Sequence, residues 1–213
     1  MTSLARTINV ISPFYVDPVK IKVIDPFKIT DFKRDKYELE CFLIFAVLVA
    51  GKTAKVISKC LSKLLKETHE LSNLTKFMPF KSFENLTQNQ IEMLLKKHGI
   101  GCYSLKSKAI FDLIRRNFNL KLVSPQDLEN VIGIGCKTSR FFVLHSRPVD
   151  DIAVIDTHIC KHFKDMGFTN APKSTPNKKQ YRKWELLFLE LVKNSGMSCA
   201  EYDLMIWAKY SRR

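Results

Sequence analysis

Apolar residues recur at helical spacing through most of the chain after residue 35. Residues 37–50 form an almost continuous apolar stretch that Gly51 ends, and its longest apolar run, residues 41–50, is too short to cross a bilayer. After Thr53, apolar side chains three and four positions apart share one face, with lysines on the opposite side. A lysine face of this kind is most often solvated and less often faces DNA. We therefore expect a central helix buried on all sides, followed by an amphipathic helix that Thr53 caps.

Capping signals mark the other helices. Thr87 and Gln90 have the spacing of a capping box, and Gly99 is expected to end the helix that they open, after a polar and aromatic connection at 71–86. A helix is expected at 104–118, with Arg115 and Arg116 in its last turn, and a short one at 127–132 after Ser124 and Pro125. Four more are expected: directly after Lys137, from Asp156 to Met166, at 180–194, and after a capping box at Ser198 and Glu201. The pattern predicts a mainly α fold of eight or nine helices.

The first 33 residues differ from the rest. Pro13, Pro18 and Pro26 interrupt short β-branched or aromatic runs, which indicates extended segments with one hairpin or edge strand. A chain of 213 residues can bury one sizeable core, either as one domain or as two lobes that share a cleft. We expect residues 1–213 to form a single unit, with one helical lobe at 52–150 and a second lobe from 1–51 plus 151–213.

The chain is strongly basic, with a formal net charge of +14. This excess suggests a polyanionic partner, because neutralising phosphates supplies most non-specific affinity for nucleic acid. A basic protein that merely stays in solution, or one that binds a membrane surface, fits the charge as well. The six cysteines are scattered without a C-x-x-C pair, and no signal peptide is evident, which favours a reduced intracellular protein with free thiols.

The stretch from residue 131 to residue 158 carries the candidate chemistry. Gly133-Ile134-Gly135 lies between two helical runs, as in a helix-hairpin-helix module spanning 125–146. Two glycines allow a tight turn whose N–H groups bind a phosphate, and Ile134 would plug the hairpin into the core. Such hairpins contact the DNA backbone and therefore position the protein without reading sequence.

Lys137 and Asp156 sharpen this interpretation. The positive end of a helix disfavours the ammonium form of a lysine, so Lys137 in the first turn after the hairpin is a candidate amine nucleophile. Asp156 follows an apolar approach, residues 153–155, and a carboxylate there can stabilise positive charge that develops on a sugar. Taken singly, Lys137 would be a solvated surface residue and Asp156 a helix N-cap.

Residues 128–138, LENVIGIGCKT, followed by residues 153–158, AVIDTH, resemble the signature of the helix-hairpin-helix DNA glycosylase superfamily that contains endonuclease III. The resemblance implies that Lys137 attacks the deoxyribose C1′, expels a damaged base and forms a Schiff base, after which β-elimination nicks the strand. It assigns to Asp156 the aspartate role of assisting attack and stabilising the sugar cation. It also implies DNA-phosphate contacts for the hairpin and its flanks, namely Gly133, Ile134, Gly135, Thr138 and His158.

Residues 39–44, 98–109 and 200–207 extend the similarity to the compact archaeal and bacterial 8-oxoguanine DNA glycosylase/AP lyases. In that group an aromatic residue near the C-terminus helps to hold the flipped base, which makes Trp207 the matching candidate; its alternative is a core aromatic. Two features depart from the pattern. Ile132 stands where endonuclease III-like members usually have proline, and the tail from Lys209 does not match the family's ending.

The resemblance also bounds cofactors and partners. Endonuclease III carries an iron–sulfur cluster on four C-terminal cysteines, whereas only Cys199 lies in that region here, so we expect no cluster. His158 and His162 lack a third ligand, so no metal and no cofactor is expected. The expected partner is double-stranded DNA with a damaged base, bound by a monomer away from membranes. Two alternatives stay open: a glycosylase for oxidised pyrimidines, and a non-catalytic DNA-binding module.

Overall fold

The computed structural model describes residue 21 and residues 24–211, and within them it contains ten helices and no strand. The helices are α1 (Lys36–Val49), α2 (Ala54–Ser72), α3 (Pro79–Glu84), α4 (Gln88–Lys97), α5 (Tyr103–Leu113), α6 (Pro125–Glu129), α7 (Cys136–Ser146), α8 (Thr157–Asp165), α9 (Lys178–Ser195) and α10 (Cys199–Tyr210). The mainly α fold is confirmed. The predicted hairpin or edge strand falls largely outside the described residues, and residues 24–33 contain turns at 26–27 and 32–33 but no strand. In this described part, no helix is both long and apolar enough to span a membrane.

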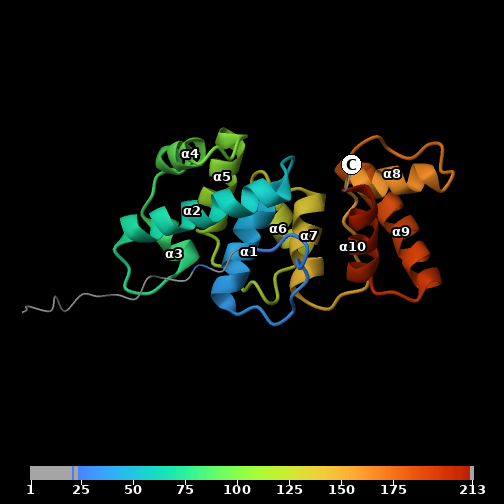
Figure 1. Ribbon diagram of the computed structural model, residues 1–213, viewed down its shortest axis with the longest axis horizontal. Helices are drawn as coiled ribbons and strands as arrows, with labels where there is room; N and C mark the ends of the chain where they lie inside the picture. The colour runs from blue at the N-terminus through green and yellow to red at the C-terminus, as the bar shows by residue number, and fades with distance from the viewer. Residues whose placement is uncertain (1–20, 22–23, 212–213) are drawn as a thin grey trace, which may run out of the picture.

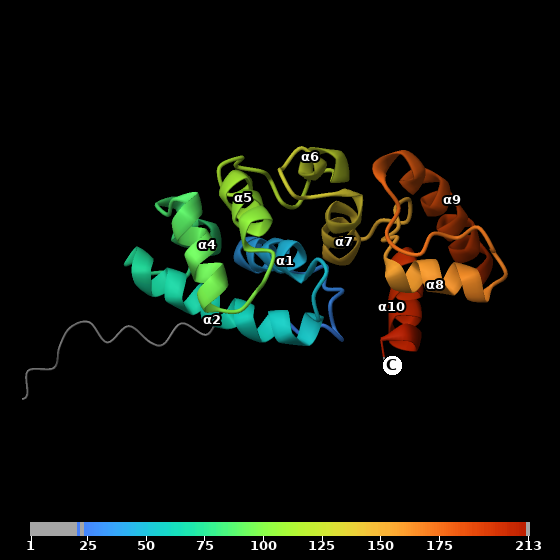
Figure 2. The ribbon, with the colours of Figure 1, turned by 90° about the horizontal axis from the view of Figure 1, so that it is seen from above.

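Helix α1 is the centre of the larger group of helices (Figures 1 and 2). It contacts α2, α3, α5 and α7, and every residue from Leu39 to Leu48 is buried, as the apolar run predicts. The one acidic residue in this run, Glu40, accepts a hydrogen bond from the Phe80 N–H at 3.0 Å, while burial raises the pKa of its carboxyl group. The buried ammonium group of Lys106 donates to the Leu48 carbonyl at the end of the helix.

Helices α8, α9 and α10 gather at one end of the molecule, beyond α7 (Figures 1 and 2). The chain reaches them through residues 147–156, and α10 contacts α7, α8 and α9. The predicted lobes were 52–150 and 1–51 plus 151–213, which places α1 in the second lobe. In the structure α1 instead contacts α2, α3, α5 and α7, which all belong to the first lobe. The apolar surface of α1 needs cover on all sides, and the four surrounding helices supply it.

The predicted capping boxes at Thr87 and Ser198 are present, and the helix start predicted at Ser124 and Pro125 also carries a capping box, formed by Ser124 and Asp127. Thr53 stands at the N-cap of α2, but its side chain makes no cap hydrogen bond, which corrects that prediction. The connection at 71–86 contains the short helix α3, and α6 occupies 125–129 rather than 127–132.

Helix α5 ends at Leu113, five residues before the predicted end, so Arg115 and Arg116 lie beyond it. Arg116 donates to Asp112 and to the Asn130 carbonyl, and Asn117 takes a left-handed conformation with φ of 47°. These contacts tie the end of α5 to the chain just before the hairpin, which stops the helix early.

Candidate active site

A helix-hairpin-helix is present, formed by α6, the turn at 131–135 and α7. Gly133 has a φ of +86°, and a Cβ added there would lie 3.2 Å from Leu105 Cδ1 and 3.3 Å from Ala109 Cβ. Only glycine fits this combination of left-handed backbone and close packing against α5. Ile134 is 4% exposed, so it plugs the turn into the core as predicted.

The hairpin leaves some of its N–H groups available. The Ile134 N–H donates to the Val131 carbonyl at 3.1 Å, so the turn itself uses this donor. Gly133 and Gly135 are exposed, and no acceptor for their N–H groups occurs among the residues that the structure describes. The two glycine amides, at the start of α7, are therefore the donors that the turn presents to an anion.

Beside the hairpin lies a cavity of about 730 Å³ that is lined by residues from both groups of helices. Lys137 enters it from the first turn of α7, Asp156 from the start of α8, and Trp207 from α10. Thr138 and His158 also line it. Ile134 and Gly135 instead line a smaller neighbouring cavity of about 310 Å³, which Lys137 and Thr138 share. Lys137 and Asp156, 19 positions apart in the chain, thus face one space.

Asp156 is a helix N-cap, the role that its position before Thr157 and His158 predicted when taken singly. Its Oδ1 accepts hydrogen bonds from the N–H groups of His158 at 2.8 Å and Ile159 at 3.0 Å, which makes it the N-cap of α8. Within the described part of the chain, no donor reaches its Oδ2. One oxygen caps the helix while the other is free to act in the cavity.

Residues 153–155 hold Asp156 in place. They are buried, as predicted for an apolar approach, and their backbone bonds to side chains of α9. The Tyr181 hydroxyl donates to the Ala153 carbonyl at 2.9 Å and accepts from the Ile155 N–H at 2.8 Å. Burial raises the pKa of this hydroxyl well above its usual value, so it remains a donor at physiological pH.

Tyr181→Phe is expected to lower the free energy of unfolding by about 1–3 kcal/mol, because it leaves a buried carbonyl and a buried N–H without partners. Urea denaturation of the two proteins measures the difference. Tyr37→Phe, at an exposed tyrosine of α1, is the matched control and should change stability little. Equal stability of Tyr181→Phe and the parent protein would contradict the assigned hydrogen bonds.

Trp207 is half-buried and its ring meets the ring of Phe27 edge-on, with centroids 5.4 Å apart and planes at 71°. It therefore belongs to the cavity wall rather than to the closed core. His162 is different from His158: it is buried, its Nε2 lies 3.3 Å from the Tyr202 hydroxyl, and burial lowers its pKa. His162 therefore packs between helices, whereas His158 lines the cavity.

The cavity wall also contains residues that were not among the predicted site residues, and Phe27, Lys52, His145 and Asp203 are among them. His145 is buried, with Nε2 3.3 Å from Asp203 Oδ2 and Nδ1 2.7 Å from the Thr30 hydroxyl. The available signal was the spacing of Asp203 and Trp207, which are four residues apart and so share a face of α10.

The pKa of the Asp203 carboxyl group depends on the charges around the cavity. Burial raises its pKa, and the hydrogen bond from His145 opposes that rise. The charge of Lys137 also lowers the pKa of Asp203, while the charge of Asp156 raises it. Lys137 and Asp156 therefore both act electrostatically on one buried group, consistent with their lining one cavity.

Comparison with known proteins adds to this geometry. The sequence profile of the 8-oxoguanine DNA glycosylase family matches residues 22–197. An 8-oxoguanine DNA glycosylase/AP lyase of Picrophilus torridus is 26% identical over 188 residues, which cover 84% of this chain and 84% of that protein.

Two solved structures share the fold. The crystal structure of the Methanocaldococcus jannaschii 8-oxoguanine glycosylase/lyase in complex with 15mer DNA containing 8-oxoguanine aligns with a TM-score of 0.67 at 22% identity, covering 87% of each chain. The 8-oxoguanine DNA glycosylase of Thermotoga maritima aligns with a TM-score of 0.64 at 23% identity, covering 83% of this chain and 81% of that one. The family profile spans most of the sequence, including the hairpin, Lys137 and Asp156, and the chain belongs to the 8-oxoguanine DNA glycosylase family.

Proposed function

We propose that this protein is a bifunctional DNA glycosylase/AP lyase that removes 8-oxoguanine from double-stranded DNA and then nicks the strand. The observation that carries the proposal is the shared cavity of Lys137 and Asp156 beside a hairpin with free backbone N–H groups. Membership of the family and the names of the relatives support the choice of lesion. The protein acts inside the cell, as a monomer and without an iron–sulfur cluster.

The reaction begins at the deoxyribose. The Lys137 amine forms a bond to C1′ while the bond from C1′ to the base breaks, and the base leaves with the electron pair and takes up a proton. Opening of the sugar ring gives a Schiff base between Lys137 and C1′. Loss of a proton from C2′ then expels the 3′ phosphate, which is the β-elimination that nicks the strand.

Asp156 acts through the oxygen that does not cap α8. As the base departs, positive charge develops on the sugar, and a carboxylate at the edge of the cavity stabilises that charge. The capping hydrogen bonds fix the orientation of the carboxylate in advance, so little reorganisation is needed when the charge appears.

DNA docks on the hairpin before the chemistry. The N–H groups of Gly133 and Gly135 bind a phosphate beside the lesion, with Thr138 and His158 flanking that contact, and the Ile134 side chain anchors the turn from below. The net charge of +14 predicts affinity that falls steeply with salt. The damaged nucleotide leaves the stack, which costs a few kcal/mol, and enters the cavity.

Trp207 is proposed to hold the extruded base by stacking. Trp207→Ala should slow excision of 8-oxoguanine by roughly 10- to 100-fold, since an aromatic stack on a base contributes about 1–3 kcal/mol. Cleavage of a duplex with a preformed abasic site should change much less, because no base remains to be held. Trp207→Phe keeps an aromatic face and should recover most of the activity; equal loss on both substrates would contradict a base-holding role.

The function is tested by incubating the protein with a panel of matched duplexes: one with 8-oxoguanine, one with an oxidised pyrimidine, and one undamaged. Strand cleavage and covalent trapping with borohydride should be strongest with 8-oxoguanine. Preference for the oxidised pyrimidine would indicate the endonuclease III-type activity instead. Binding to every duplex without base release or trapping would indicate a non-catalytic DNA-binding module.

A further inference from the structure

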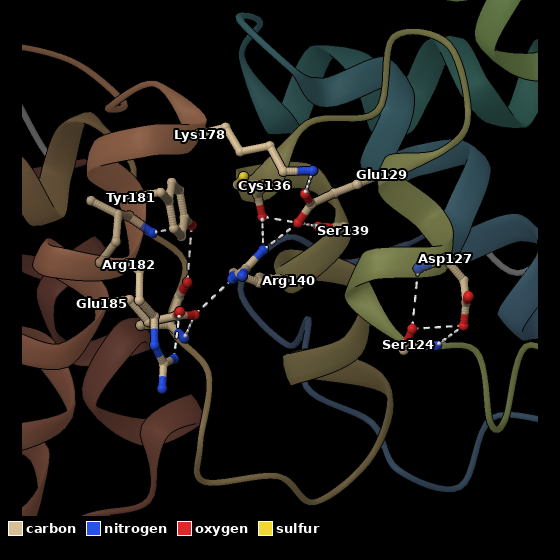
Figure 3. A network of polar contacts seen from close by, with 12 residues as sticks. Ser124, Asp127, Glu129, Cys136, Ser139, Arg140, Lys178, Tyr181, Arg182 and Glu185 are labelled. Atoms are coloured by element: carbon tan, nitrogen blue, oxygen red, sulfur yellow. Dashed lines mark hydrogen bonds and ion pairs between the residues drawn. The ribbon is translucent and has the colours of Figure 1, made fainter.

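An ion-pair network joins the hairpin to α9 (Figure 3). At its centre is Arg140, buried on α7 one turn after Lys137. Arg140 Nε donates to Glu185 Oε1 at 2.6 Å, and Arg140 Nη1 donates to Glu129 Oε1 at 2.6 Å. A single guanidinium thus links the last residue of α6, the helix that carries Lys137, and α9.

Glu185 extends the network to the approach to Asp156. Its Oε1 also accepts the Ala153 N–H at 3.1 Å, three residues before Asp156. Tyr181, one turn earlier on α9, holds the neighbouring Ile155 N–H and Ala153 carbonyl. The same face of α9 therefore fastens the backbone that leads to Asp156 and, through Arg140, the helix that bears Lys137.

We propose that Arg140 and Glu185 are positioning residues that set the separation between Lys137 and Asp156 across the cavity; this rests on the proposed function of those two residues. Neither of the two touches the substrate. Lys137 is on α7 and Asp156 follows residues 147–155, so the relative placement of the two groups depends on what ties the segments together. The ion pair of Arg140 with Glu185 supplies that tie directly.

The chemistry of the pair suits this task. A buried ion pair contributes little net stability, because both charges must leave water, whereas its hydrogen bonds are short and strongly directional. The forked guanidinium can bond carboxylates from two different helices at once, which an ammonium group cannot do with the same geometry. Arg140 therefore fixes an orientation that apolar packing alone would leave looser.

The chain offers a matched control in the same network. Arg182 donates to Glu185 Oε2 at 2.8 Å, but both residues belong to α9 and the Arg182 side chain is 60% exposed. Removing Arg182 takes a positive charge from the same carboxylate without cutting any link to α7. An exposed pair of this kind contributes little to stability.

The test compares Arg140→Lys, Glu185→Gln and the control Arg182→Gln with the parent protein, using single-turnover assays with protein in excess. Two duplexes are used, one with 8-oxoguanine and one with a preformed abasic site that needs the Lys137 amine but no base release. Arg140→Lys and Glu185→Gln should each slow 8-oxoguanine excision by roughly 100-fold, as expected for a displacement of about 1 Å. Trapping on the abasic site should fall much less, and Arg182→Gln should remain near the parent protein on both substrates.

A second readout places Arg140→Lys in an Asp156→Asn background. If Arg140 acts by positioning Asp156 against Lys137, the second change should add little to the loss from the first. Normal excision by Arg140→Lys and Glu185→Gln would overturn the proposal, as would equal losses on both duplexes or fully additive losses in the double variant. A parent protein that neither excises nor traps would instead overturn the proposed function, and this proposal with it.

Discussion

Lys137→Gln is expected to abolish the covalent adduct that borohydride traps on a duplex with 8-oxoguanine. Glutamine keeps much of the length and polarity of the side chain but has no amine, so no bond to C1′ and no Schiff base can form. Strand nicking should disappear with the adduct. Binding to the intact duplex should persist, because the hairpin N–H groups that we propose to bind the phosphate belong to Gly133 and Gly135 and have no acceptor among the described residues.

The control for this experiment is Lys63→Gln, an exposed lysine on α2 that does not line the cavity. It removes the same charge from the protein and should leave trapping unchanged. Adduct formation by Lys137→Gln at the rate of the parent protein would show that another amine is the nucleophile.

Asp156→Asn is expected to slow base excision by roughly 100- to 1,000-fold, the range found when one preorganised electrostatic contact with developing charge is removed. The side-chain oxygen of asparagine can still accept the N–H groups of His158 and Ile159, and asparagine is a good N-cap. The unfolding midpoint should therefore stay near that of the parent protein. Single-turnover excision and thermal unfolding, measured on the same preparation, separate the two effects.

Asp156→Ala should lose the same activity and also about 1 kcal/mol of stability, because alanine cannot cap α8. Asp35→Asn serves as the matched control for Asp156→Asn: Asp35 is the N-cap of α1, where its side chain accepts the Glu38 N–H, but it does not line the cavity. It should leave excision unchanged. Near-normal excision by Asp156→Asn would remove the carboxylate from the mechanism.

Local signals predicted much of this structure. The capping boxes at Thr87 and Ser198, the helix start at Ser124 and Pro125, and the glycines of the hairpin act within a few residues, so they can be read from the chain directly. The apolar run at 41–50 predicted a buried helix for the same reason. Lys137 and Asp156 could be identified from the sequence because a local pattern marks each position. Lys137 lies at a helix start after a turn, and Asp156 lies at a helix start after a buried segment.

Contacts between distant residues were not predictable in this way. Arg140 and Glu185 are 45 positions apart, His145 and Asp203 are 58 apart, and Thr30 and His145 are 115 apart. Nothing in the neighbourhood of any of these residues indicates its partner. The early end of α5 has the same origin, because Arg116 bonds the Asn130 carbonyl beyond the next turn.

The proposed division of roles between the two oxygens of Asp156, one capping α8 and the other acting in the cavity, has a practical consequence. An amide at this position keeps the oxygen that caps α8 and removes the negative charge in the cavity, so capture of a lesion is separated from its processing. Immobilised on a resin, the Asp156→Asn protein would retain fragments of genomic DNA that carry the lesion and release them intact at high salt.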